Sequence, residues 1–129
     1  MCGGDDDLRE LFLAELILEC AAIRHASRYD AHGLAELRAA NERLQAAGDP
    51  AAAEEAFHRL LVAPAPPRVR WALEPLRRAL RPHRVEAERC AVAHEGVIRA
   101  LERGNHGGAE RRLRRHLLCA LPRTAPQAA

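Results

Sequence analysis

The sequence predicts an all-α protein that folds as an antiparallel bundle of about six helices. Alanine, leucine, arginine and glutamate, all good helix formers, dominate its 129 residues. Apolar residues recur at helical spacing, and no segment shows the alternating pattern of a strand. Proline, glycine and capping residues divide the chain into segments with short connections, which favours antiparallel neighbours. Aromatic residues make up only 3% of the chain, so the core is expected to be aliphatic.

Capping and breaking residues delimit the first three helices. Asp7, Asp30 and Asp49 each precede an apolar-periodic segment and can accept a hydrogen bond from a free helical N–H. Gly48 is expected to end the second helix. The "PAPP" segment (64–67) is expected to end the third. The predicted ranges are 8–28, 30–47 and 50–63.

Proline and glycine also delimit the last three helices. Pro75 lies inside the fourth and should kink it, and Pro82 ends that helix or bends it into the fifth. Gly104 should terminate the fifth helix, and Asn105 should cap the sixth. The predicted ranges are 68–81, 85–103 and 106–121. The helical domain then covers residues 8–121, between disordered segments at 1–7 and 122–129.

Composition excludes several classes of protein. The chain has 20 basic and 18 acidic residues, a balance that gives no case for a nucleic-acid-binding surface over the whole domain. Its four cysteines form no CxxC pair, so neither a disulfide scaffold nor a cysteine zinc site is indicated. No apolar run approaches the ~18 residues of a membrane span, and the start of the chain is no signal peptide. We therefore expect a cytoplasmic protein with no membrane partner.

Three histidines fall on the apolar faces of three separate helices. Glu54 and His58 are four residues apart, so they lie on one face of the third helix. His94 and His116 occupy inner positions of the fifth and sixth helices. Their neighbours in the apolar stripes are Ile98 and Leu101 for His94, and Leu113 and Ala120 for His116. His25 follows a similar stripe and is expected in the core or lining a pocket.

Burying imidazoles costs free energy unless their nitrogens find partners. Convergence on a metal ion supplies such partners, because three neutral imidazoles and a carboxylate suit a borderline divalent ion such as zinc, nickel, cobalt or manganese. The alternative is that each histidine forms ordinary hydrogen bonds within the core. Spacing alone does not decide between them.

The same residues belong to a longer pattern. "EEAFH" stands at 54–58, and the last two predicted helices hold a spaced set of matching residues. That set is His94, Ile98, Ala100, Gly104, Asn105, Ala109 and His116. In this pattern the chain resembles the FCD domain, the C-terminal effector-binding domain of FadR-type regulators of the GntR family. The resemblance covers about residues 8–121.

The resemblance implies a site and its ligands. Glu54, His58, His94 and His116 would hold a divalent cation (zinc, nickel or manganese), which helps to bind a small carboxylate effector in the bundle. Glu15 stands where many members carry an arginine that contacts this effector. We therefore take Glu15, Arg24 and His25 as candidate ligand-binding residues.

The sequence thus predicts a metal-dependent sensing domain that forms a homodimer and is not an enzyme. Members of the family contact DNA through an N-terminal winged helix-turn-helix domain, and no such pattern occurs in this sequence. One alternative is a helical dimerisation module that binds no ligand. Another is a metal-assisted hydrolase, although no nucleophile motif or further general base accompanies the histidines.

Overall fold

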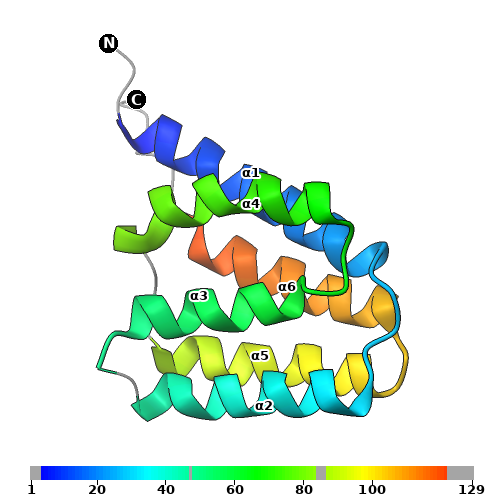
Figure 1. Ribbon diagram of the computed structural model, residues 1–129. Coiled ribbons are helices and arrows are strands. Elements are labelled where there is room, and N and C mark those ends of the chain that lie inside the picture. Colours follow the sequence, from blue (N-terminus) through cyan, green and yellow to red (C-terminus); the bar gives the residue numbers. More distant parts are fainter. Residues whose placement is uncertain (1–3, 47, 84–86, 122–129) are drawn as a thin grey trace.

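The computed structural model describes residues 4–46, 48–83 and 87–121, and these ranges contain six α-helices and no strand (Figure 1). The helices are α1 (Gly4–Arg24), α2 (Ala31–Ala46), α3 (Pro50–Leu61), α4 (Pro67–Leu80), α5 (Ala87–Glu102) and α6 (His106–Ala120). A short 3₁₀ helix, η1 (Arg81–His83), follows α4. The predicted all-α bundle of about six helices is confirmed.

Helix α6 joins two groups of helices. On one side it packs on α1, which in turn packs on α4. On the other side it packs antiparallel on α5, which contacts α2 and α3 (Figure 1). Residues on α1, α3, α5 and α6 can therefore meet where the two groups adjoin.

The predicted caps of three helices are confirmed. Asp30 Oδ1 accepts from the Gly33 N–H at 2.7 Å, at the start of α2. Asp49 caps α3 through the Ala52 N–H at 3.2 Å. Asn105 Oδ1 accepts from the Gly108 N–H at 2.8 Å, at the start of α6.

The first helix differs from its prediction. Helix α1 begins at Gly4 instead of residue 8, so Asp7 lies within the helix and is not its cap. It ends at Arg24, four residues before the expected end. The rest of the predicted disordered segment, residues 1–3, lies outside the described residues. So does the predicted tail at 122–129.

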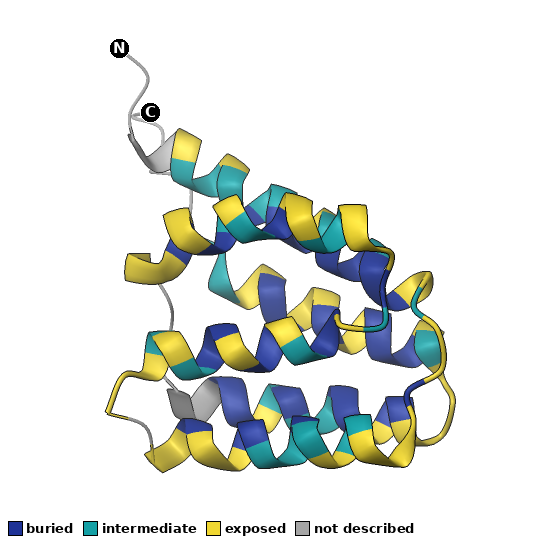
Figure 2. Cartoon of the chain, viewed as in Figure 1, coloured by how far each residue is buried: buried dark blue, intermediate teal, exposed yellow. Residues whose placement is uncertain are grey.

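The core is mainly aliphatic, as predicted, although Phe12, Tyr29 and Phe57 are also buried, and the helices turn their buried faces towards one another (Figure 2). Its largest cluster draws on five helices and includes Leu37, Phe57, Ile98 and Leu113. Cys20, Cys90 and Cys119 form no disulfide. None of the helices in the described ranges has both the length and the apolarity needed to cross a bilayer.

Two glycines shape the turn that pairs α5 with α6. Gly104 has φ +71°, a left-handed conformation that favours glycine. The next N–H, of Asn105, bonds to the Ala100 carbonyl at 2.9 Å and closes the end of α5. A Cβ on Gly108 would lie 2.5 Å from Asn105 Nδ2, so Gly108 lets the cap close over the start of α6.

We expect Gly104→Ala to lower the free energy of unfolding by about 1 kcal/mol, since alanine is strained at positive φ. Gly107→Ala is the matched control, because Gly107 lies inside α6 and an added Cβ would meet no atom closer than 3.5 Å. Because Gly107 is exposed in the first turn, this change should alter stability by less than about 0.5 kcal/mol. Urea unfolding of both variants measures the difference, and equal effects would contradict the role given to Gly104.

Candidate metal centre

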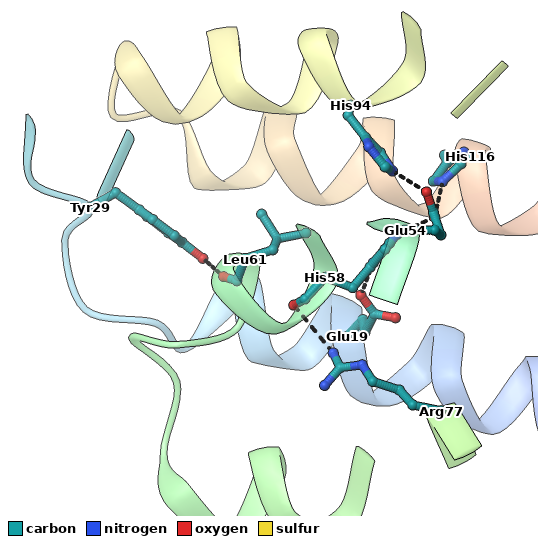
Figure 3. A network of polar contacts seen from close by, with 8 residues as sticks. All are labelled: Glu19, Tyr29, Glu54, His58, Leu61, Arg77, His94 and His116. Carbon is teal, nitrogen blue, oxygen red and sulfur yellow. Dashed lines mark hydrogen bonds and ion pairs between the residues drawn. The ribbon is translucent and has the colours of Figure 1, made fainter. Parts of the chain in front are cut away.

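Four side chains from three helices converge inside the bundle (Figure 3). Helix α3 supplies Glu54 and His58, α5 supplies His94, and α6 supplies His116. Each offers one ligand atom, and these atoms all lie within 4.8 Å of one another. All four side chains are buried, with His116 the least so at 9% exposure of the residue. The structure therefore brings together the four residues that were predicted to bind metal.

The Glu54 carboxylate stands at the centre of this group. Its Oε1 lies 2.6 Å from His58 Nε2 and 3.4 Å from His116 Nε2. Its Oε2 lies 3.2 Å from His94 Nε2. All three imidazoles thus turn the same nitrogen towards one carboxylate (Figure 3).

The orientation of His94 is set by Asn41 of α2. Asn41 Nδ2 donates to the Ala91 carbonyl at 2.9 Å, so its Oδ1 is left to accept. His94 Nδ1 lies 3.1 Å from this Oδ1 and therefore carries the ring proton. The Phe57 ring stacks on the imidazole, with 3.7 Å between ring centroids. As a result, His94 Nε2 presents a lone pair to Glu54.

No hydrogen-bond donor among the described residues faces the lone pair of His94 Nε2. Among the described residues, neither His94 Nε2 nor Glu54 Oε2 has a hydrogen-bond partner, although both atoms are buried. Two acceptors that face each other at 3.2 Å are costly in the interior of a protein. A cation between them would satisfy both, so the donor set fits a metal ion.

His58 bridges two carboxylates. Its Nδ1 contacts Glu19 of α1, and its Nε2 contacts Glu54. Burial would lower the pKa of His58, but the charges of Glu19 and Glu54 outweigh burial and raise it to about 10. Burial lowers the pKa of His94 to about 4, so this ring is neutral near pH 7. For Glu54, burial is outweighed by the charge of His58 and the contacts with the three imidazoles, which hold its pKa well below the usual value.

The other three candidate residues lie apart from this group. Glu15 is buried on α1, one turn before Glu19. Arg24 is exposed and pairs with Glu110 through two hydrogen bonds of 2.8 and 2.7 Å. His25 is also exposed, contrary to its predicted place in the core or a pocket, because α1 ends at Arg24 and the apolar stripe does not extend to it. Roles for Glu15, Arg24 and His25 in ligand binding stay predictions.

Three supporting residues around the centre were not predicted from the sequence. Glu19 orients His58, Asn41 orients His94, and buried Arg77 of α4 donates to the His58 carbonyl at 3.2 Å. A signal existed for two of them, because Glu19 and Asn41 interrupt otherwise apolar inner faces. Their partners could not be inferred, since each lies on a different helix.

A buried carboxylate with three histidines in an all-α bundle defines a helical domain with a candidate metal centre. Residues 10–118 match the family model of the FCD domain, and the chain belongs to this family. FCD domains are regulatory domains that bind small-molecule effectors. No curated protein and no solved structure matches the chain.

Asn41→Leu should lower the free energy of unfolding by about 2 kcal/mol, because it leaves two buried polar groups, His94 Nδ1–H and the Ala91 carbonyl, without a partner. Gln45→Leu is a suitable control, since Gln45 is exposed one turn further along α2. Urea unfolding monitored by circular dichroism compares the two variants. A loss no larger than that of the control would show that Asn41 does not hold His94.

Proposed function

We propose that this chain is the metal-dependent sensing domain of a GntR-type transcription regulator, and that its effector is a small organic acid. Membership of the FCD family supports the regulatory role. The observation that carries the metal dependence is the pair of facing acceptors, His94 Nε2 and Glu54 Oε2, buried without hydrogen-bond partners in the described ranges.

The four residues Glu54, His58, His94 and His116 would hold the ion. Three imidazole nitrogens and one carboxylate favour a divalent ion such as zinc, nickel or manganese. His94 is already neutral, and Glu54 is already ionised. His58 would release its Nε2 proton and keep Nδ1–H on Glu19, the usual support for a metal-binding histidine. A bound ion would supply a Lewis acid and positive charge to the centre.

The proposed readout is a shift between conformations of the bundle. An effector changes this equilibrium only by its difference in affinity for the two conformations. DNA would be contacted through a winged helix-turn-helix domain, and the described residues include no strand that could form its wing. Such a regulator would act in the cytoplasm.

We also propose that the domain forms a homodimer through α1 and α4. These helices pack on each other, and each exposes a large apolar side chain. Ile17 of α1 is 63% exposed, and Trp71 of α4 is 69% exposed. A second copy that covers both side chains would remove them from water, which favours association.

Zinc should raise the melting temperature of the protein, because an ion that binds only the folded state stabilises it. His94→Ala should weaken zinc binding by more than about 100-fold, since loss of a ligand costs more than loss of its supporting partner. His32→Ala is the control, because this histidine is 83% exposed. Competition with a chromophoric chelator measures the affinity. Equal affinity in His94→Ala and the wild-type protein would rule out this metal centre and favour a dimerisation module that binds no ligand.

Trp71→Glu should convert the dimer to a monomer, because a charge would then be buried at the contact. Val92→Glu places the same charge on α5, at a residue that is 75% exposed, and should leave the dimer intact. Light scattering coupled to size-exclusion chromatography gives the mass of each variant. A wild-type monomer, or a Trp71→Glu dimer, would contradict the proposed interface.

A further inference from the structure

A hollow between α5 and α6 adjoins the metal centre. Its volume is about 310 Å³, which is near the lower limit for small-molecule sites. His116 forms part of its wall and is also one of the four metal-centre residues. A ligand in this hollow, called the α5–α6 groove below, would therefore contact a side chain that belongs to the metal centre.

The wall of the groove has an apolar part and a basic part. Val92 and Ala93 of α5 and Cys119 of α6 form much of the apolar part. Val92 is 75% exposed, so a ligand with an apolar body would cover surface that now faces water. The basic part consists of Arg112 and Arg115, both on α6.

The two arginines are available to an anion. Arg114, between them in sequence, pairs with Glu110, whereas neither Arg112 nor Arg115 forms an ion pair with any described carboxylate. Gly96 of α5 lets Arg112 lie close against that helix, because a Cβ there would be 3.1 Å from Arg112 Nη1. The glycine thus makes room for a guanidinium at the groove.

The opposite side of the metal centre is closed by buried side chains. There Glu19 of α1 contacts His58, and Arg77 of α4 donates to the His58 carbonyl. All three side chains are at most 1% exposed. A ligand can therefore approach more readily from the α5–α6 groove.

We propose that the α5–α6 groove is the effector site and that it takes a short apolar monocarboxylate. The carboxylate pairs with Arg112 and Arg115, and the apolar chain lies on Val92, Ala93 and Cys119. This inference rests on the proposed function, whose effector site it locates. Because His116 is shared, acid and metal each raise the affinity of the other by the same factor.

Calorimetry with hexanoate tests the proposal on the zinc-loaded and the metal-free chain, with 1-hexanol as the uncharged probe. Hexanoate should bind once per chain and more tightly than hexanol. Arg112→Gln and Arg115→Gln should each weaken hexanoate binding by about tenfold, the order expected for one hydrogen bond to a charged group. Arg111→Gln is the matched control, because Arg111 is exposed on the same helix and lies outside this groove.

Ala93→Phe offers a test that keeps every charge. It fills the apolar part of the groove and should abolish hexanoate binding, with zinc affinity and the circular dichroism spectrum unchanged. If hexanoate does not bind, or binds Arg112→Gln and Arg115→Gln as tightly as wild type, the groove is not the effector site. Zinc binding that depends on His94 would still support the proposed metal centre in that case.

Hexanoate binding that does not depend on zinc would be a different outcome. If hexanoate binding depends on the two arginines but is equal with and without zinc, the groove stands as an acid-binding site. That outcome would overturn both the coupling through His116 and the metal dependence in the proposed function.

Discussion

The structure depends on one buried carboxylate, Glu54, which faces three imidazoles in the interior of the bundle. A carboxylate removed from water is costly unless charge and hydrogen bonds compensate. His58 supplies much of the compensation here, since it carries a proton between Glu54 and Glu19. The other side of Glu54 lacks such compensation, because His94 turns a lone pair towards it. Protein groups therefore satisfy Glu54 Oε1, through His58, but not Glu54 Oε2 or His94 Nε2. These two unsatisfied acceptors have the chemistry of a cation site.

The hairpin of α5 and α6 gives the site its geometry. His94 and His116 lie on different helices, and both place Nε2 near Glu54. The two helices lie in this relative position because the turn between them is short. Gly104 reverses the chain at positive φ, and the next residue, Asn105, is already the N-cap of α6. A longer or looser turn would let one helix slide along the other. A residue far from the metal centre thus controls the distance between two of its members.

The helices and the inner-face positions of the four residues could be predicted from the sequence because both follow from local rules, whereas their convergence was implied by the resemblance to the FCD domain. Helical periodicity placed Glu54, His58, His94 and His116 on inner faces, and caps such as Asp49 marked the helix starts. The extent of α1 was wrong at both ends, and with it the burial of His25, because no strong stop signal separates Arg24 from Asp30. Glu19 and Asn41 were missed for another reason, since their roles arise from contacts between helices distant in sequence.

The charge on α1 changes how an acid could be sensed in this chain. Glu15 stands where the resemblance to the FCD domain predicts an arginine that contacts the effector carboxylate. Here Glu15 is buried on α1, while Arg112 and Arg115 line the groove between α5 and α6. An effector bound in the groove would act on α6 directly, and α6 packs on both α1 and α5. Since α1 also packs on α4, a small movement of α6 would reach the proposed dimer contact through α1.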